Sequence, residues 1–408
     1  MIVWLIKINE PLPFEEKERK GRTSLMADSL ADSNDMVIWW TSTFNHYPKQ
    51  KYNSKSKIIK IKENYHIYML PSIGYKKNVS LMRYIDHFFV SKMFKLKSRR
   101  CKKPDLIIAS SPWHHLAYEA IRYAKKNNIY VILDVRDPWP DSFLQYIPDG
   151  YKNLMKLLLF YDFHIMKFSA KNANSITAVS NSLMNFGLNY AEREQTKYDK
   201  VFYNGYKIPV NKNKFDINTP SLSKVESIKE SFIVIYIGGF SELHDPSILL
   251  DIADSLKSLS IQFVLAGKGE KYAELENKSK MMNNIHLVGW LNNNEIAKLI
   301  SYGNVGFAPT NFVSEILPNK AIMYLSGGLP VISAFHGDLR IIINKYQAGL
   351  NYTPGNMVEV KNAIRKLYDD EELYKQMSKN ALVVYNNFFR SDLIFERYKQ
   401  FVKEIVSV

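Results

Sequence analysis

Residues 310–333 read TNFVSEILPNKAIMYLSGGLPVIS and hold the pattern that decides the fold. The stretch is bordered by two short apolar runs, NVGFAP at 304–309 and LPVISA at 329–334, which are typical of buried strands. A longer helical pattern runs between them and ends at the Gly327-Gly328 turn. Strand, helix and strand in this order predict a βαβ unit with parallel strands.

The same alternation extends along the whole chain. Apolar runs, each followed by a longer helical pattern, recur from end to end. They are IVWLIKI, MVIWW, HIYML, DLIIAS, YVILDV and SITAVS, then FIVIYIG, QFVLAG, IHLVGW, NVGFAP and LPVISA. With 408 residues and 46% hydrophobic content, the chain is long enough for two domains. We therefore predict an α/β protein with two Rossmann-like parallel-sheet domains, with ligands beyond the carboxyl ends of the strands.

A polar segment at 209–231 separates the two groups of strands. It contains Pro220 and several serines and has no strong periodicity, which indicates an interdomain linker. We predict an N-terminal domain of residues 1–209, completed by a C-terminal helix at 388–408. The C-terminal domain is expected at residues 210–387.

The positive charge of the chain is concentrated in its first half. Net charge is +15, and residues 1–210 hold 33 basic and 19 acidic residues against 22 and 21 in the remainder. Segment 49–103 alone holds 16 basic residues and two acidic ones, so it faces an anionic partner or is a well-solvated surface. Within it, residues 79–103 read as a helix with clustered apolar residues and a basic end. This suits an anionic membrane surface or a lipid-diphosphate acceptor, and equally a helix packed on the sheet with solvated lysines.

Cysteine usage and the length of apolar runs bear on location. The one cysteine, Cys101, forms no internal disulfide, and the first residues give only a short apolar run broken by Lys7. No window approaches the roughly 20 uninterrupted apolar residues that cross a bilayer. We expect a cytoplasmic protein, soluble or peripheral on the inner face of the membrane. No nucleic-acid-binding module is recognised, so a nucleic acid partner is not expected.

The second half contains the features of an anion-binding site. The strand FIVIYI is followed by Gly238 and Gly239, which let the backbone approach a ligand or simply make a tight turn. Pro318 suits the first position of a helix, so the free N–H groups of Asn319 and Lys320, with the lysine ammonium, would present positive potential to a phosphate. We therefore predict a diphosphate-binding site at this helix start.

Glu315 lies in the loop just before this diphosphate-binding site. We expect its carboxylate beside the group attached to the diphosphate, where it accepts hydrogen bonds from sugar hydroxyls. The structural alternative is that Glu315 caps a helix and Lys320 is a solvated surface lysine. A further helix start is predicted at Asp245, with Pro246 just inside it.

Three loops of the first half follow predicted strands and fall where a cleft-facing loop is expected. Histidines are prominent in two of them, although a lone histidine is more often a structural residue. The candidate residues are Gly21 and Arg22 in the first loop, His46 in the second, and His114 and His115 in the third.

Together these motifs resemble the retaining, two-domain glycosyltransferases of family 4, which have the GT-B architecture, particularly bacterial enzymes of surface-polysaccharide assembly. The resemblance spans nearly the whole chain and rests on the order and spacing of its motifs. They are GRTSLMADSLADSNDMVIWWTSTFNH, PDLIIASSP, ILDVRDPWPD, ANSITAVSNSL, VFYNGYKIP, YIGGF, VLAGKGE, IHLVGWLNNNEIAKLI and LPNKAIMYLSGGLPVIS. The resemblance implies two domains facing across a cleft that binds a nucleotide-diphosphate sugar. The sugar would pass to a glycan or a polyprenyl-diphosphate-linked acceptor in capsule, O-antigen or exopolysaccharide assembly.

The resemblance also assigns donor-binding residues. In the family, two glutamates separated by seven residues bind the sugar and the ribose hydroxyls. Glu315 is the first of them here, whereas Met323 stands at the second position. Loss of that carboxylate would cost about 1.5–3 kcal/mol of donor affinity if nothing replaced it. Asn319 and Lys320 keep their roles, but the departure leaves open a catalytically degenerate protein that acts as a binding or scaffold partner.

Two further assignments follow from the resemblance. Gly289 and Trp290 resemble the turn that binds the base of the donor. The loop containing Asp137 faces the acceptor in the resembling enzymes, so Asp137 orients the incoming hydroxyl or forms a purely structural pair with Arg136.

The chemistry expected from the sequence needs no metal. Neither an Asp-x-Asp cluster nor a Cys/His ligand set is recognised, so no metal and no cofactor are expected. Helix N-termini and Lys320 would stabilise the charge that builds up as the nucleoside diphosphate leaves. The resemblance implies retention of anomeric configuration, with Glu315, Lys320 and Asp137 as the catalytic residues. A dinucleotide-dependent oxidoreductase is a third hypothesis, against which the missing glycine fingerprint after the first strand argues.

Overall fold

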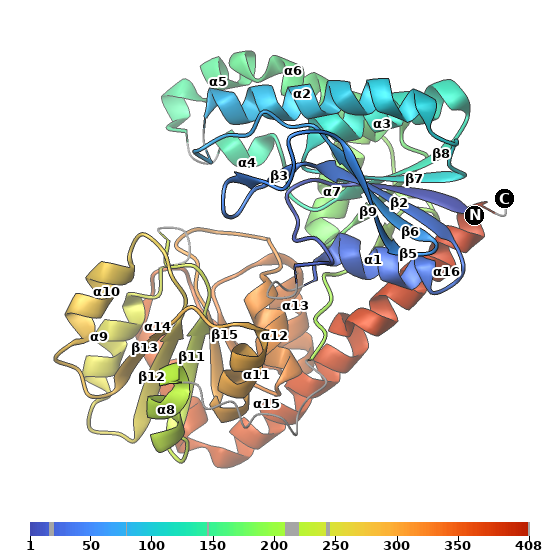
Figure 1. The fold of residues 1–408 in the computed structure, drawn as a ribbon. Coiled ribbons are helices and arrows are strands. Elements are labelled where there is room, and N and C mark those ends of the chain that lie inside the picture. Colours follow the sequence, from blue (N-terminus) through green and yellow to red (C-terminus); the bar gives the residue numbers. More distant parts are fainter. Residues whose placement is uncertain (16–19, 79, 145–146, 209–219, 242–244, 407–408) are drawn as a thin grey trace. The chain divides into compact units, whose positions relative to one another are not determined.

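The computed structural model describes residues 1–15, 20–78, 80–144, 147–208, 220–241 and 245–406. The chain forms two compact units, each with its own sheet and core (Figure 1). The N-terminal unit comprises Met1–Tyr203 and Leu393–Val408, and the C-terminal unit comprises Asn204–Asp392.

The N-terminal unit is built on an eight-stranded sheet with the order β10-β9-β8-β7-β1-β2-β6-β5. All neighbours pair in parallel except β5 and β6, which are antiparallel. The strands are β1 (Ile2–Ile6), β2 (Met36–Ser42), β5 (Lys57–Lys62), β6 (Tyr65–Leu70), β7 (Leu106–Ser111), β8 (Tyr130–Val135), β9 (Ser175–Ala178) and β10 (Lys200–Val201). A short hairpin of β3 (Phe44–Asn45) and β4 (Gln50–Lys51) lies outside this sheet.

Helices cover both faces of this sheet (Figure 1). Successive residues of a strand point to opposite faces, so in β1 the side chains of Trp4 and Ile6 join one apolar core while Val3 and Leu5 join the other. The first core is closed by α2, α3, α6 and α7, and the second by α1 and α16. The helices are α1 (Arg22–Ala31), α2 (Leu81–Lys97), α3 (His114–Asn127), α4 (Asp141–Leu144), α5 (Lys152–Leu158), α6 (Phe160–Asn172), α7 (Asn181–Ala191) and α16 (Ser391–Val406), with 3-10 turns at Ser98–Arg100 and Asp149–Tyr151.

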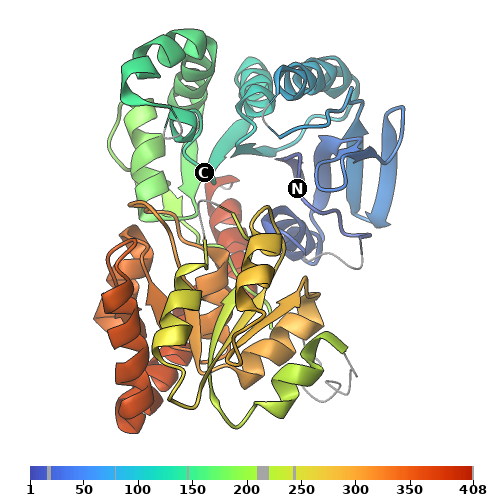
Figure 2. The same cartoon turned by 90° about the vertical axis from the view of Figure 1, so that its left-hand side faces the viewer.

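The C-terminal unit has a six-stranded, fully parallel sheet with the order β13-β12-β11-β14-β15-β16 and helices on both faces (Figure 2). Its strands are β11 (Phe232–Ile237), β12 (Ile261–Ala266), β13 (Ile285–Gly289), β14 (Val305–Ala308), β15 (Val331–Ser333) and β16 (Gly349–Asn351). Its helices are α8 (Pro220–Ser227), α9 (Ile248–Ser255), α10 (Tyr272–Ser279), α11 (Asn293–Tyr302), α12 (Asn319–Ser326), α13 (Gly337–Tyr346), α14 (Met357–Asp369) and α15 (Glu371–Val384), followed by a π-helical turn at Tyr385–Phe389.

Every apolar run taken as a strand in the sequence forms one, which confirms the two Rossmann-like parallel sheets. The linker prediction was wrong for part of segment 209–231. Residues 220–227 form α8, which packs on α11 and β13 because Leu222 and Val225 are buried. Residues 209–219 lie outside the described part of the chain. Within the described residues, no helix combines the length and the apolar character needed to cross a membrane.

Candidate functional site

The strand order of the C-terminal unit reverses between β11 and β14. From β11 the chain moves outward through β12 and β13, and from β14 it moves in the other direction through β15 and β16. Ligands of open parallel sheets bind beyond the carboxyl ends of the strands at such a reversal. The segments that leave the sheet there are the Gly238-Gly239 turn after β11 and the loop 309–318 after β14. Both were selected from the sequence.

The glycine turn after β11 is packed closely against the turn after β12. The N–H of Gly238 donates to the carbonyl of Ala266 at 3.0 Å. A Cβ on Gly267 would stand 1.8 Å from the carbonyl oxygen of Gly238, so only glycine permits this approach. A Cβ on Gly239 would meet no atom closer than 3.9 Å. The turn therefore leaves room beside the Gly239 backbone.

Helix α12 is fixed at the reversal by Tyr324. This fully buried side chain accepts a hydrogen bond from the N–H of Ile237 at 2.8 Å and donates to the carbonyl of Phe307 at 3.2 Å. Its ring occupies the space beside Gly306, where a Cβ would stand 2.1 Å from the ring. One tyrosine thus ties α12 to the ends of β11 and β14 and sets the position of the first turn of α12.

Lys320 lies in that first turn. Among the residues that the structure describes, its buried ammonium has no hydrogen-bond partner. It lies 4.1 Å from the ring centre of Tyr236, and a Cβ on Gly238 would be 3.0 Å from Nζ. Burial lowers the pKa of Lys320 to about 7. An uncompensated buried cation costs folding free energy, and an anionic ligand would supply the missing partner.

The backbone at the start of α12 adds to this positive potential. The sequence predicted Pro318 as the first residue of the helix. In the structure it is the residue before the helix, because its ψ of 132° is extended. Its carbonyl accepts from the N–H of Ala321 at 3.1 Å. The N–H groups of Asn319 and Lys320 have no acceptor within the described residues. Two free N–H groups at the positive end of a helix form an anion site.

Glu315 lies in the loop that leads into α12. The loop is held by the N–H of His336, which donates to the carbonyl of Ser314 at 2.7 Å. Gly337 has φ +63°, and a Cβ there would be 2.9 Å from the carbonyl oxygen of Glu315. The backbone of Glu315 is therefore fixed while the residue itself is exposed. No hydrogen bond from the helix N–H groups to its carboxylate is found among the described residues, so the capping alternative is not supported.

The remaining donor-side candidates differ in exposure. Gly289 ends β13 with φ +72°, and its carbonyl accepts from the N–H of Gly267 at 2.7 Å. Trp290, the next residue, is 63% exposed and leaves its indole free to stack. Met323 is 8% exposed on the buried side of α12. The predicted helix start at Asp245 was two to three residues early, because α9 begins at Ile248.

In the N-terminal unit, Gly21 and Arg22 make internal contacts. Arg22 is buried, with Nη2 3.2 Å from Oδ1 of Asp134, and its Nη1 donates to the carbonyls of Phe202 and Tyr203 at 2.8 and 3.1 Å. Its guanidinium is thus used inside the unit. The cleft-facing role expected for Arg22 is corrected to a structural one.

Glycine is needed at position 21 because the carboxylate of Glu10 packs against it. Glu10 was not predicted from the sequence as a site residue. A Cβ on Gly21 would lie 2.3 Å from Oε1 of Glu10. Glu10 accepts from the N–H groups of Thr23 and Ser24 at 2.6 and 3.3 Å and so caps α1. Arg136 holds this carboxylate in place with Nη1 at 2.9 Å from Oε2. Gly21 is therefore a packing requirement rather than a ligand contact.

Asp137 is accessible to solvent and lies two residues after the end of β8. The structural alternative, a pair between Asp137 and Arg136, is not formed, because Arg136 pairs with Asp134 at 2.7 Å and with Glu10. Loss of hydration raises the pKa of Asp137, although the charges of Lys7 and Arg136 oppose the shift. Lys7, also missed from the sequence, is half-buried, and loss of hydration followed by the charge of Arg136 lowers its pKa to about 8.

His46 is half-buried in the hairpin loop, and its Nδ1 lies 2.6 Å from the hydroxyl of Tyr75. Burial, and then the charges of Lys49 and Arg83, lower its pKa to about 4. The imidazole is therefore neutral near pH 7. This excludes His46 as a cationic contact for an acceptor at that pH.

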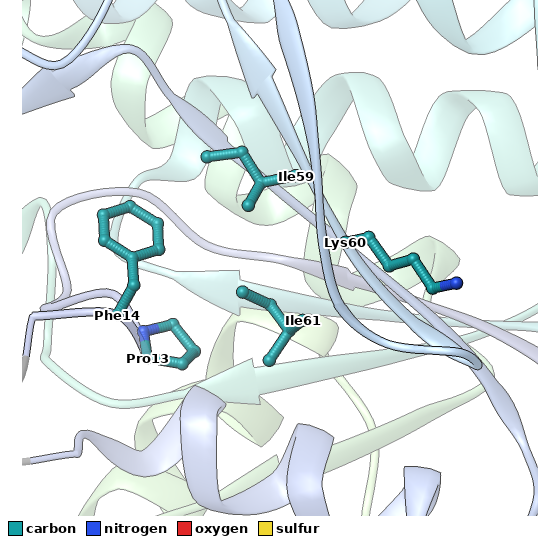
Figure 3. A pocket seen from close by; sticks show the side chains of 5 residues that line it. All are labelled: Pro13, Phe14, Ile59, Lys60 and Ile61. Atoms are coloured by element: carbon teal, nitrogen blue, oxygen red, sulfur yellow. The ribbon is translucent and has the colours of Figure 1, made fainter.

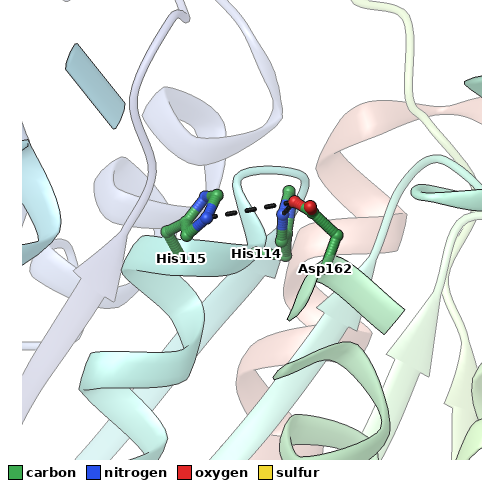
Figure 4. A group of neighbouring side chains, drawn as sticks. All are labelled: His114, His115 and Asp162. Carbon is green, nitrogen blue, oxygen red and sulfur yellow. Dashed lines mark hydrogen bonds and ion pairs between the residues drawn. The ribbon is translucent and has the colours of Figure 1, made fainter. Parts of the chain in front are cut away.

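His114 and His115 open α3 and are both buried. His114 Nε2 bonds to Oδ1 of Asp162 on α6, and His115 Nε2 lies 3.9 Å from the same oxygen (Figure 4). Burial lowers the pKa of both imidazoles, that of His115 to about 3. The cleft-facing role expected for this pair is corrected, because neither ring reaches the surface of the unit.

The described part of the N-terminal unit includes a mainly apolar hollow and a basic one. One, of about 360 Å³, is lined by Pro13, Phe14, Ile59, Lys60 and Ile61; in Figure 3 the apolar side chains face one another and Lys60 points away. The other, of about 570 Å³, combines four lysines with two aromatic rings. These are Lys49, Lys51, Lys76, Lys77, Phe44 and Tyr75. Four of the sixteen basic residues of segment 49–103 thus line one concave surface.

Comparison with known proteins agrees with this architecture. Residues 219–383, less than half of the chain, match the family model described as glycosyl transferases group 1. An uncharacterized glycosyltransferase of Methanocaldococcus jannaschii is 24% identical over 221 residues, covering 53% of this chain and 56% of that protein. The sulfoquinovosyl transferase of Arabidopsis thaliana is 24% identical over 283 residues, covering 68% of this chain and 52% of that protein. The matched regions thus span about half the length of these relatives.

Solved structures match the whole chain. Sucrose-phosphate synthase from Thermosynechococcus elongatus superposes with a TM-score of 0.72 at 15% identity, covering 100% of this chain and 99% of that one. Anabaena HepE in complex with UDP superposes with a TM-score of 0.69 at 14% identity, covering 99% of both chains. At such identities the likeness shows the fold. The chain therefore has the GT-B fold, with two Rossmann-like units, and its C-terminal unit matches the model of the group 1 glycosyl transferases.

Proposed function

We propose that this chain is a glycosyltransferase that moves a sugar from a nucleotide-diphosphate donor to an acceptor hydroxyl. The observation that carries the proposal is the buried ammonium of Lys320, which has no hydrogen-bond partner among the described residues and lies at the sheet reversal. It stands beside the free N–H groups of α12 and the glycine turn after β11. A diphosphate would neutralise this potential with two adjacent negative groups.

The same groups provide the catalytic effect. As the bond to the sugar breaks, negative charge builds on the departing diphosphate, and donors already aimed there stabilise the transition state more than the ground state. We propose that the α12 N-terminus and Lys320 serve this purpose without a metal ion on the donor. Glu315, whose loop is anchored at Gly337, would bind the sugar hydroxyls. Asp137, exposed and with a raised pKa, would orient the acceptor hydroxyl.

Retention of anomeric configuration is proposed on the strength of the motif resemblance. The base of the donor is proposed to stack on Trp290, because this indole is exposed directly after the turn at Gly289. Base stacking on an aromatic ring typically contributes about 1–3 kcal/mol. One relative of the same fold is described in complex with UDP-glucose, which makes uridine donors the first to test.

The acceptor is proposed to be a glycan or a polyprenyl-diphosphate-linked sugar. The hollow with Lys49, Lys51, Lys76 and Lys77 offers positive charge beside aromatic rings, which suits a phosphorylated lipid. The start of α2 borders it with exposed apolar side chains, Leu81 at 74% and Met82 at 48% exposure. Assembly of cell-surface polysaccharide would supply such acceptors.

We further propose that the N-terminal unit binds the anionic inner surface of a membrane. The apolar side of α2 is continued by the start of α6, because Phe88 and Tyr161 both contact the ring of His115. Helix α5 directly precedes α6 in the chain and packs on it. Leu157 and Leu158 in α5 are 71% and 67% exposed. Exposed leucines bordered by lysines are typical of an interfacial surface. Flotation with anionic and with neutral liposomes tests this, and binding to neither would refute it.

The donor site is tested with purified protein and a panel of UDP-, GDP- and dTDP-sugars. We expect one nucleotide to raise Tm, and transfer to be lost in both Glu315→Ala and Lys320→Ala. The Lys320 variant should also lose the Tm shift, since its ammonium contacts the diphosphate. Lys366→Ala, an exposed lysine on α14, serves as the matched control and should behave as wild type. Full transfer by both site variants would refute the proposal.

A catalytically degenerate binding or scaffold protein is the second candidate. It is favoured by Met323, which places a buried thioether where the resembling enzymes have a ribose-binding glutamate. This candidate predicts no Tm shift with any nucleotide and no hydrolysis of any donor. A shift with one nucleotide that Lys320→Ala abolishes would decide against it.

A further inference from the structure

Three ligand-type side chains converge inside the N-terminal unit, whereas the residues proposed for the donor site belong to the C-terminal unit. His114 and His115 are the first residues of α3, and Asp162 lies in the first turn of α6. One atom from each lies within 4.8 Å of the others, and all three residues are at most 3% exposed. Figure 4 shows the three side chains as neighbours, with the contact between His115 and Asp162 drawn as a dashed line.

This cluster is not satisfied by its own hydrogen bonds. Neither ring nitrogen of His115 has a hydrogen-bond partner among the described residues. A buried unpaired nitrogen normally costs about 1–3 kcal/mol. His114 Nε2 faces both the carboxylate of Asp162 and the indole N–H of Trp139 at 3.3 Å. One nitrogen cannot donate to a carboxylate and accept from an N–H at once.

A divalent ion would resolve the contacts among the three side chains. We propose that His114 Nε2, His115 Nε2 and Asp162 Oδ1 bind one zinc ion that links the start of α3 to the start of α6. Two imidazoles and one carboxylate are a ligand set of the kind that zinc takes, with one position left for a further ligand. The mixed nitrogen and oxygen donors disfavour calcium and magnesium, which prefer oxygen alone.

The three ligand atoms lie within 4.8 Å of one another, and side-chain rotation would have to bring them closer. Ligands at about 2.0–2.1 Å in a tetrahedral site stand about 3.3 Å from one another. His115 Nε2 and Asp162 Oδ1, now 3.9 Å apart, would approach by roughly half an ångström, while the hydrogen bond from His114 to Asp162 would open. Trp139 would turn its N–H away from His114, since the metal takes that lone pair.

A supporting contact is already in place. The hydroxyl of Tyr84 on α2 donates to Oδ2 of Asp162 at 3.2 Å, which leaves Oδ1 for the ion. Such outer contacts orient the ligating carboxylate, and their loss typically weakens metal binding about 10–100-fold. Because all three ligands are buried, the ion would stabilise the N-terminal unit rather than react. It is separate from the donor diphosphate, which is proposed to need no metal.

The test uses full-length protein without a polyhistidine tag, stripped with a chelator and dialysed against zinc. We expect one zinc per chain by elemental analysis, a rise in Tm on zinc addition, and the visible absorption of a tetrahedral site with cobalt. His115→Gln should lose the bound zinc and the Tm rise. Tyr84→Phe should keep one zinc with an affinity about 10–100-fold lower. His164→Gln, an exposed histidine on α6, is the matched control and should bind as wild type.

Two results would overturn the proposal. One is a wild-type chain that retains no zinc and shows no Tm change. The other is one zinc bound with equal affinity by wild type and His115→Gln, which would place the ion elsewhere. If His115→Gln fails to fold by circular dichroism, Asp162→Asn replaces it, because the amide keeps the shape of the carboxylate and removes its charge. Wild-type affinity in Asp162→Asn would be equally decisive against the site.

Discussion

Replacing Lys320 with methionine is expected to stabilise the C-terminal unit while abolishing donor binding. Methionine keeps a chain of similar length without its charge, and the ammonium of Lys320 is buried without a hydrogen-bond partner in the described structure. The pKa falls from 10.5 to about 7 on folding. Each pKa unit corresponds to about 1.4 kcal/mol, so the ammonium opposes folding by up to about 4 kcal/mol at pH 7.

The sign of the pH dependence follows from proton uptake. Between pH 7 and 10.5 the unfolded chain keeps a proton on Lys320 that the folded chain has released, so wild-type stability rises with pH across this window. Below pH 7 both states are protonated and the full penalty applies. The advantage of Lys320→Met should therefore be largest in acid and fade as the pH approaches 10.5. Urea unfolding of both proteins at about pH 6.5 and about pH 9.5 measures the difference.

A donor titration of wild type and Lys320→Met accompanies the unfolding measurements. Lys320→Met should show no Tm shift with the nucleotide that stabilises wild type, so stability and binding move in opposite directions. Lys366→Met controls for the general effect of adding an apolar side chain at an exposed position. If Lys320→Met is less stable than wild type at pH 7, the ammonium has a partner in solution, and the argument for an empty anion seat is refuted.

Further tests address the supports of this site. Tyr324→Phe leaves the N–H of Ile237 and the carbonyl of Phe307 unpaired and should lower the free energy of unfolding by roughly 2–4 kcal/mol, measured in urea. Gly267→Ala puts a Cβ against the Gly238 carbonyl and should weaken nucleotide affinity at least about tenfold by calorimetry. Wild-type donor affinity should fall by up to about tenfold per pH unit above about 7, as Lys320 loses its proton. Lys320→Arg should remove that slope, because its guanidinium stays charged.

The fold was largely predictable from local sequence, and the exceptions have physical causes. Parallel strands buried on both faces are continuous apolar runs, so the strands at the centre of both sheets were found. β5 is not predicted because KIIKIK lies within the basic block, where three isoleucines among three lysines fit a segment that faces an anionic partner or is solvated. α8 was missed because two buried residues, Leu222 and Val225, are too few to show a period in a polar stretch.

The candidate site was predictable only where one segment carries it. Pro318 to Lys320 form a helix start by themselves, so their role was expected from sequence. The burial of Lys320 could not be predicted from the sequence, because it depends on Tyr236, 84 positions earlier, and on the Gly238 turn. Asp162 lies 48 positions from His114, a separation that no local pattern reveals.

The N-termini of α1 and α12 differ in the two units, and under the proposed function this difference directs the diphosphate to the C-terminal unit. Both sheets reverse their strand order, so the strand rhythm alone offers two sites of the same kind. In the N-terminal unit, the carboxylate of Glu10 already occupies the start of α1, held by Arg136, and Gly21 provides the room for it. A phosphate there would meet a negative charge and find the first N–H groups taken. In the C-terminal unit, α12 begins without a capping side chain, and Lys320 adds a cation that no described residue neutralises. The carboxylate of Glu10 thus occupies the start of α1, whereas the start of α12 is left for an anionic ligand.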